Sequence, residues 1–265
     1  MNEKNPDALT RRTKILYGSG DFGFSLTDTI IGVIFAIFLT DVAGLQPGYA
    51  AAGIFIGRSW DYINDPLIGH LSDRTRTRWG RRRPFLLFGF IPFGIAFILM
   101  WWIPPISTQV GLMFYYALAY LIFDAAVTVV SMPYFALTPE LTPDYDERTS
   151  LTSYRMAFSI LGGLIAFTVP LILIGPMRPE NADRVMMMGI LFGTVSALPV
   201  LLTFIGTRER PEYQTRSQPK LLTSLKSALK NRPFIFAAGL FLFTWTGLNI
   251  VQTMLLYFLK YRLNL

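Results

Sequence analysis

The chain places several polar residues inside an apolar stretch that is long enough to cross a membrane. Arg58, Asp61, Asn64 and Asp65 follow one another closely in the segment that ends at Pro66. An ionisable residue in the bilayer core costs about 2.5–3.5 kcal/mol on insertion scales, so such a group indicates a function. In a helix the spacing puts Asp61 and Asp65 on one face, together with Arg58 and Asn64. Two carboxylates and a carboxamide there would offer oxygen ligands to a small cation, which indicates a transporter driven by an ion gradient.

Composition places this segment in a polytopic helical membrane protein. The chain has 265 residues, of which 52% are hydrophobic and only 15% charged, and its mean hydropathy is +0.42. A soluble domain carries about 25% charged residues. There is no cysteine, which excludes disulfides and cysteine metal sites. The net charge of +7 is explained by membrane topology, so we expect no nucleic-acid partner.

Seven apolar segments are predicted to be helices that span the bilayer. They cover residues 15–41, 49–71, 85–103, 110–137, 151–174, 185–205 and 234–260. The first six are expected to form an N-terminal bundle over residues 1–206, followed by a polar cytoplasmic linker at 207–232. The segment 233–265 then supplies a seventh helix, which we interpret as the start of a second bundle that lies outside this chain.

Basic residues predict how the chain sits in the membrane. They cluster before the first helix, between the second and third helices, and after the sixth, as in Lys14, Arg76 and Arg210. Because lysine and arginine are enriched in cytoplasmic loops, we expect a cytoplasmic N-terminus and a location in the inner (plasma) membrane. Trp101 and Trp102 are expected at the outer interface, where an aromatic belt would lie.

Several motifs give the chain a resemblance to a known family. They are Gly69 to Arg74 with Gly80 to Arg83, the run from Arg58 to Pro66, and Tyr17 to Gly23. Together they resemble the melibiose-permease-like glycoside–pentoside–hexuronide:cation symporter family of the major facilitator superfamily. The resemblance covers nearly the whole chain but only the N-terminal half of a full transporter plus its seventh helix. It implies an all-α, major-facilitator-type six-helix bundle, no enzyme activity, and no cofactor beyond a coupling ion (Na⁺, Li⁺ or H⁺).

The resemblance also implies where the coupling ion binds. The matching cation positions are Asp61, Asn64, Asp65 and Thr128, and all of them carry oxygen ligands. A monovalent cation is the only metal expected, at Asp61 and Asp65. The alternative is that the two aspartates only form internal ion pairs with Arg58 and Arg155.

The sugar site departs from the family pattern. Ser25 and Ser131 stand where the sugar-binding acidic residues would be, and Phe135 stands at the aromatic stacking position. Other candidates for solute binding lie on the same helices or match cavity-lining positions of the family: Asp28, Asp124, Arg155 and Arg58. Carboxylates accept hydrogen bonds from sugar hydroxyls, so we expect a polyhydroxylated solute. For Asp28 and Asp124, a packing or gating contact is the alternative.

The arginine-rich loop is interpreted as part of a cytoplasmic gate. We expect Gly69 to allow a neighbouring helix to come close and Asp73 to face a helix N-terminus of the other half. The basic members are Arg74, Arg81, Arg82 and Arg83, which are expected to bond inner-facing groups such as Glu140 or Glu147. The alternative is that the arginines only fix the topology.

The predicted function is secondary active, cation-coupled symport of a sugar or glycoside by alternating access. A carrier of lysolipids with the same fold is the first alternative, because both usual sugar carboxylates are missing. A seven-helix receptor is disfavoured by the charge bias, and a membrane enzyme by the lack of a nucleophile or metal-ligand cluster. The expected partners are a small solute, a monovalent cation, the lipid bilayer and the C-terminal half of the same protein.

Overall fold

The computed structural model describes residues 8–210 and 230–263, and for Asp61, Tyr62 and Ile63 it describes the backbone only. Within these ranges the chain is helical, and its extended pairing is limited to one isolated bridge between Thr77 and Gly80. The helices are α1 (Arg11–Ile30), η1 (Ile31–Phe35), η2 (Phe38–Val42), α2 (Pro47–Arg58), α3 (Asp61–Arg74), α4 (Arg83–Leu99), α5 (Gln109–Leu141), α6 (Tyr145–Ile174), η3 (Pro179–Asn181), α7 (Ala182–Gly206) and α9 (Arg232–Arg262). The predicted all-α bundle is therefore confirmed.

The first two predicted helices differ from the expectation in detail. The first continues past α1 through two π-helical segments, η1 and η2. The second is not one helix, because a turn at Ser59 and Trp60 separates α2 from α3. The helix that was predicted to carry Arg58, Asp61 and Asn64 is therefore divided between Arg58 and Asp61, and the prediction that these residues share one face stays a prediction.

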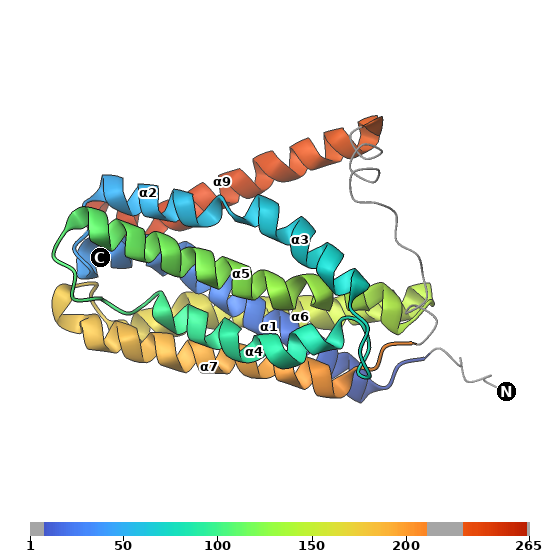
Figure 1. Cartoon of the computed structure of the whole chain (residues 1–265). Coiled ribbons are helices and arrows are strands. Elements are labelled where there is room, and N and C mark those ends of the chain that lie inside the picture. The colour runs from blue at the N-terminus through green and yellow to red at the C-terminus, as the bar shows by residue number, and fades with distance from the viewer. Residues whose placement is uncertain (1–7, 211–229, 264–265) are drawn as a thin grey trace.

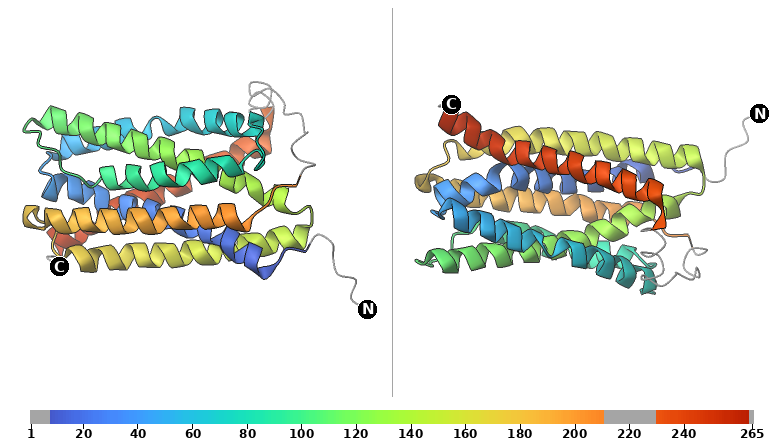
Figure 2. Two further views of the ribbon diagram at one scale, coloured as in Figure 1. Left: turned by 60° about the horizontal axis from the view of Figure 1, so that its bottom comes forward. Right: turned by 90° about the horizontal axis from the view of Figure 1, so that it is seen from above.

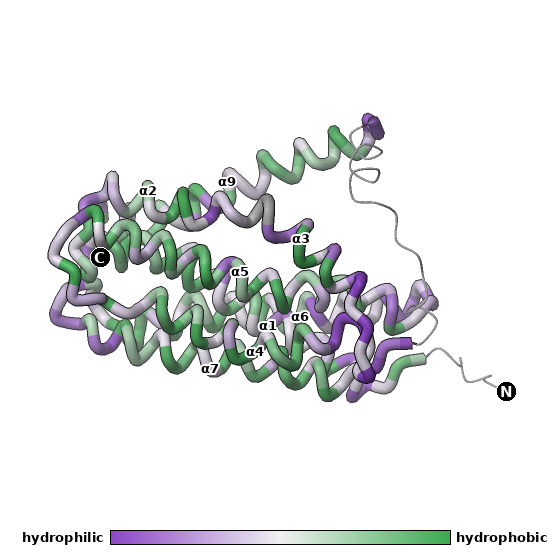
Figure 3. Tube along the Cα trace, in the orientation of Figure 1, coloured by the Kyte–Doolittle hydropathy of each residue, from purple (hydrophilic) through white to green (hydrophobic). Residues whose placement is uncertain are grey.

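The helices run alternately up and down, so the bundle has two ends (Figures 1 and 2). We call the end where α1, α4 and α6 begin the near end. The far end holds the turns at 43–46, 100–108 and 175–178. Figure 3 shows hydrophilic residues gathered at the near end, around the turn between α3 and α4, and hydrophobic residues along the helices.

The helices begin at residues whose side chains suit a helix N-terminus. Thr10, Thr108, Asp144 and Asn231 each accept a hydrogen bond from the backbone N–H three residues later. Such caps satisfy backbone donors that have no partner inside the helix. They set where α1, α5, α6 and α9 start.

Helix α1 lies at the centre of the packing. It packs against α6 and α7, α4 packs between α5 and α7, and α2 and α3 lie along α5. Small residues permit the closest approaches: a Cβ on Gly162 would lie 2.7 Å from the carbonyl oxygen of Phe22. Without a hydrophobic force between helices in lipid, such tight backbone contact is a main source of association.

The core at the far end is aromatic. Phe35 and Phe38 lie 5.7 Å and 5.3 Å from the ring of Trp101, which is fully buried. Trp102 is exposed. The expectation that both tryptophans form an interfacial belt is therefore wrong for Trp101, which packs against the first helix instead.

Four described helices are long and apolar enough to cross a membrane: α5, α6, the segment Pro179–Gly206 and α9. Helix α4 is apolar but shorter. The first two predicted spans do not appear as single long apolar helices, because of the π-helical segments and the turn described above. An integral membrane protein remains the conclusion, since the apolar surface of the longer helices would otherwise face water.

Helix α9 stands apart from the bundle over most of its length. It lies against η1 and has no buried residue. Figure 1 shows that it approaches the bundle toward its C-terminal end and diverges from it toward its N-terminal end. The predicted linker at 207–232 falls mostly at 211–229, outside the described residues.

Candidate transport site

A central cavity of about 960 Å³ lies between the first helix, α2, α3, α5 and α9. Its charged lining consists of the carboxylates of Asp28, Asp65 and Asp124 and the guanidinium of Arg58. All four were predicted to bind the cation or the solute, and the fold brings them to one cavity. Three carboxylates against one guanidinium favour a cation inside it.

The predicted cation ligands Asp65 and Thr128 meet across the cavity wall. The Thr128 hydroxyl donates a hydrogen bond of 3.1 Å to Oδ1 of Asp65, which joins α3 to α5. Thr128 is buried. The pair offers adjacent oxygen ligands of the kind that hard cations prefer.

Asn64 is turned toward the wall of the cavity. It is buried, and its Nδ2 lies 3.5 Å from the backbone carbonyl oxygen of Asp124. This contact also joins α3 to α5. Asp61 begins α3, but its side chain lies outside the described residues.

Arg58 faces α9 as well as the first helix. Its guanidinium nitrogens lie 3.4 Å and 3.5 Å from Oδ1 of Asn249. It is also close enough to Asp28 for their opposite charges to attract. Arg58 therefore lies where the two parts of the described chain meet.

Arg155 lies behind the cavity wall. Its Nε donates to Oδ2 of Asp21 at 2.7 Å, and its guanidinium lies 4.7 Å from the ring centre of Phe135. Arg155 does not line the central cavity, whereas Phe135 does. Arg155 thus supports an aromatic side chain of the cavity wall, and its predicted contact with solute remains a prediction.

Of the two serines at the usual sugar positions, one lines the central cavity and the other contacts a neighbouring helix. Ser131 lines the cavity. Ser25 instead donates a hydrogen bond of 2.7 Å to the carbonyl oxygen of Ser159 in α6. Only one of these two positions therefore faces the central cavity.

The predicted gate residues form a charged network at the near end. Arg81 and Arg82 both bond Oε1 of Glu140, at 2.5 Å and 2.8 Å, and Arg82 also lies 3.0 Å from Asp73. Arg81, Arg82 and Glu140 are buried. The expected partner Glu140 is confirmed, whereas Glu147 pairs with Lys14 instead, at 2.9 Å.

A carboxylate missed in the sequence holds the start of α4. Glu209 accepts hydrogen bonds from the backbone N–H groups of Arg81, Arg82 and Arg83, at 2.7 Å, 2.7 Å and 2.9 Å. A helix N-terminus presents such donors and favours a negative charge. Gly80, at φ +110°, leaves room for this contact, because a Cβ there would lie 2.6 Å from the Glu209 carboxylate.

The remaining gate predictions are only partly reflected in the geometry. Arg83 donates to the carbonyl oxygen of Phe204 at 2.8 Å, and Arg74 is exposed. A Cβ on Gly69 would meet no atom within 4 Å, so no described helix approaches it closely. The expected close neighbour is therefore absent from the described part of the chain.

The sequence contained a signal for some of the residues that we missed. Asp21 is an ionisable residue inside an apolar helix, as Asp28 is, and warranted the same weight. Asn249 carried no such signal, because single amides in apolar helices are common packing residues. Among the described residues, no three His, Cys, Asp or Glu side chains come together as metal ligands.

Comparisons with known proteins place this geometry in a family. The chain matches the family described as MFS/sugar transport protein over residues 16–264. It is 39% identical to an uncharacterised symporter of Synechocystis sp. over 86% of this chain and 42% of that protein. It is 27% identical to the isoprimeverose transporter of Lactiplantibacillus pentosus (94% of this chain, 52% of that one). It is 28% identical to the sodium-dependent lysophosphatidylcholine symporter 1-A of Danio rerio (97% and 54%).

A solved structure shows the same fold. The xylose transporter XylE of E. coli, in an inward-open conformation, matches with a TM-score of 0.54 and 20% identity, over 85% of this chain and 53% of that one. The chain spans about half the length of the curated relatives it matches. The match to the family, together with the motifs from Arg58 to Arg83, shows that the chain belongs to the glycoside–pentoside–hexuronide:cation symporter family of the major facilitator superfamily, a family of transporters and not of enzymes.

Proposed function

We propose that the protein is a secondary active transporter that carries a sugar or glycoside together with a monovalent cation. The observation that carries this proposal is the central cavity, in which Asp28, Asp65 and Asp124 face Arg58. Charges inside a membrane protein are costly and mark ion or substrate pathways. The relatives named as symporters support the same activity.

The cation is held at Asp65 and Thr128, whose side chains already meet. Asp61 and Asn64 belong to the same helix and complete the proposed set. Binding of a cation reduces the repulsion among the carboxylates of the cavity, which prepares it for the solute. Because the solute and the cation then cross the membrane together, a cation gradient drives accumulation of the solute.

The solute is held by Asp28, Asp124 and Arg58. Carboxylates accept hydrogen bonds from neighbouring hydroxyl groups, and a guanidinium donates several. Phe135 offers a ring face to the cavity, and Arg155 lies behind that ring. A solute with vicinal hydroxyls fits this combination of groups.

Alternating access supplies the mechanism. Residues 1–206 act as one bundle, 207–232 as a cytoplasmic linker and 233–265 as the first helix of the second bundle. In this proposal the N-terminus and the near end are cytoplasmic. The near-end residues Gly69, Asp73, Arg74, Arg81, Arg82 and Arg83 close that side when the cavity opens to the far side.

The test is uptake by inverted and right-side-out vesicles that contain the protein expressed from its complete native reading frame. Labelled mono- and disaccharides are offered under an imposed Na⁺ or proton gradient. We expect accumulation in the wild type and its loss in Asp65→Asn and Asp61→Asn. The matched control is Asp183→Asn, an exposed aspartate outside the cavity, which should accumulate as the wild type does. Gradient-driven accumulation in both Asp65→Asn and Asp61→Asn would overturn the proposal.

A lysolipid is the second candidate solute. A pocket lined largely by apolar side chains, of about 880 Å³, shares Arg58, Thr253 and Met254 with the central cavity, so an acyl chain has space beside the polar groups. The likeness to the lysophosphatidylcholine symporter favours the same candidate. Competition separates the two: free sugars inhibit uptake in the first case, and lysolipids inhibit it in the second.

A further inference from the structure

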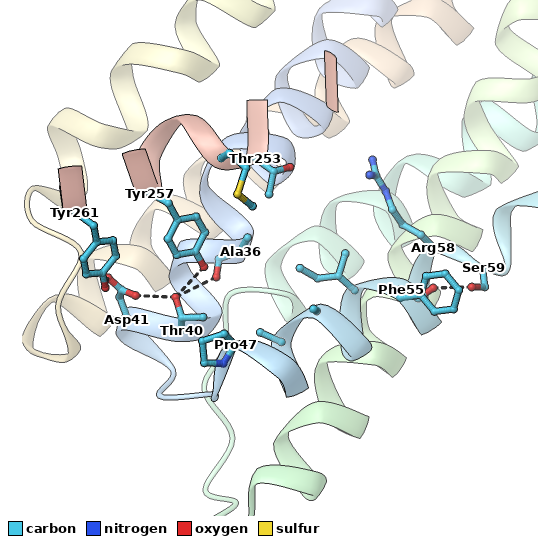
Figure 4. Close-up of a pocket in the computed structure, with 14 residues that line it drawn as sticks. Ala36, Thr40, Asp41, Pro47, Phe55, Arg58, Ser59, Thr253, Tyr257 and Tyr261 are labelled. Atoms are coloured by element: carbon cyan, nitrogen blue, oxygen red, sulfur yellow. Dashed lines mark hydrogen bonds between the residues drawn. The ribbon is translucent and has the colours of Figure 1, made fainter. Parts of the chain in front are cut away.

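The pocket beside the central cavity lies toward the far end of the molecule. Figure 4 shows that it is bounded by the end of the first helix, by α2 and by α9. It shares Arg58, Thr253 and Met254 with the central cavity, so the pocket adjoins that cavity. At the far end the pocket is bordered by Thr40, Asp41, Tyr257 and Tyr261.

Polar contacts tie α9 to the first helix at this position. Asp41 forms an ion pair with Lys260 and accepts a hydrogen bond of 2.8 Å from the Tyr261 hydroxyl. The hydroxyls of Thr40 and Tyr257 are 2.9 Å apart, and Figure 4 marks this hydrogen bond with a dashed line. These contacts join residues that are more than 200 positions apart in the chain.

Lys260 also reaches a third segment. Its Nζ donates a hydrogen bond of 3.0 Å to the carbonyl oxygen of Met177, in the turn that follows α6. One side chain therefore joins α9, the first helix and a far-end turn. The part of α9 nearer Arg232 is packed less closely, since a Cβ added at Gly239 or Gly247 would meet no described atom within 4 Å.

We infer that Asp41, Lys260 and Tyr261, with Thr40 and Tyr257, form a latch that closes the far side of the transport cavity. The latch holds α9 against the first helix while α9 diverges at the near end (Figure 1). This inference rests on the proposed alternating access, in which the cavity opens to one side at a time. Transport then requires the latch to break when the cavity opens to the far side.

The exposure of the two charges predicts an asymmetry. The Asp41 side chain is 7% exposed and the Lys260 side chain 35% exposed. Loss of Lys260 leaves a buried carboxylate without its counter-charge, whereas loss of the Asp41 charge leaves an ammonium that water already reaches. Lys260→Met should therefore open the latch more than Asp41→Asn does.

The experiment measures access to the cavity from the far side. The chain has no cysteine, so Ser131→Cys, in the lining of the central cavity, supplies a single reporter once any cysteine encoded beyond Leu265 is replaced by serine. A membrane-impermeant maleimide is applied to the far face of vesicles that contain the full-length protein. We expect labelling about tenfold faster in Lys260→Met and about threefold faster in Asp41→Asn.

The double variant tests whether the two residues act as a pair. When Asp41 is already neutral, Lys260→Met leaves no buried charge, so the double variant should label like Asp41→Asn alone. The matched control is Lys14→Met, which breaks a lysine–glutamate pair at the near end and should label as the wild type does. The inference would be overturned if Lys260→Met were labelled at the wild-type rate. It would also be overturned if the rate increase of the double variant were the product of the two single increases.

Tyr261→Phe covers the case in which Lys260→Met does not reach the membrane. It removes one hydroxyl from Asp41 and should label about twofold faster. Wild-type rates in both Tyr261→Phe and Asp41→Asn would then overturn the inference. The assay needs neither solute nor cation, so expected labelling without sugar accumulation contradicts only the proposed function.

Discussion

The two ends of the molecule are held together in different ways. At the near end, Arg81 and Arg82 share Glu140, and Glu209 holds the start of α4, so these contacts lie within the helices α1–α7 and the residues that directly follow them. At the far end, Asp41 and Lys260 join the first helix to α9. The near end is fastened within one bundle, whereas the far end is fastened across to the next helix of the fold.

This difference separates a stabilising network from a contact that can switch. Rocking of two bundles leaves contacts inside one bundle intact and breaks contacts between them. The near-end arginines therefore hold the loop between α3 and α4 in place, and the proposed near-side gate closes when the second bundle approaches this loop. The far-end contacts, like that of Arg58 with Asn249, join α9 to the first bundle, so a relative movement of α9 must change them.

The largest expected effect comes from Glu140→Ala at the near end. The change leaves two buried arginines without their shared carboxylate, which costs roughly 3–5 kcal/mol of unfolding free energy. Thermal unfolding of the purified full-length protein measures the loss. Arg74→Ala, at an exposed arginine of the same motif, should stay within about 0.5 kcal/mol of the wild type. Equal stability of the two variants would show that the near-end network is not structural.

An intermediate effect is expected at the contact of Glu209 with α4. Glu209→Ala removes a side chain that accepts from three backbone N–H groups, which should cost about 1–2 kcal/mol. Gly80→Ala should cost at least as much, because it adds strain at φ +110° and displaces the Glu209 carboxylate. Thermal unfolding of both variants measures the two losses. A Gly80→Ala variant as stable as the wild type would contradict this prediction.

Lys260→Met at the far end is expected to lower the unfolding free energy by a smaller amount. Without Lys260, the Asp41 carboxylate still accepts hydrogen bonds from the hydroxyls of Thr40 and Tyr261, and Lys260 itself is 35% exposed, so the loss should be about 1 kcal/mol of unfolding free energy. Thermal unfolding and far-side labelling of the same variant separate stability from access to the cavity. A loss of stability as large as that of Glu140→Ala would remove the contrast between the ends.

The smallest effect is expected for Lys14→Ala. Lys14 pairs with Glu147 and donates to Ser150. Without Lys14, Glu147 still accepts a hydrogen bond from the backbone N–H of Leu9 and lies in the first turn of α6, where a negative charge is favoured. Pairs of this kind at a helix end contribute about 0.2–1 kcal/mol. The stability difference should also shrink as salt is raised, which a titration with sodium chloride would reveal.

Much of the transport site was predictable because its charged residues cost free energy in a membrane and therefore mark a function. Asp28, Asp65, Asp124 and Arg58 stood out as charges in apolar segments, and all four line one cavity. Arg155 stood out in the same way, but its contact with Asp21 was not predictable. Which charge meets which depends on the rotation and tilt of packed helices, and small side chains such as Gly162 set these locally.

Hydropathy and polar residues in apolar segments are local signals, so the helical membrane class, the family and the charged residues of the cavity could be predicted from the sequence. The turn at Ser59 and Trp60, which splits the second helix, and the contact of Glu209 with α4 were found only in the folded chain. The same holds for the ion pair of Asp41 with Lys260. These partners lie far apart along the chain, and their meeting depends on the packing of whole helices, which no local pattern contains.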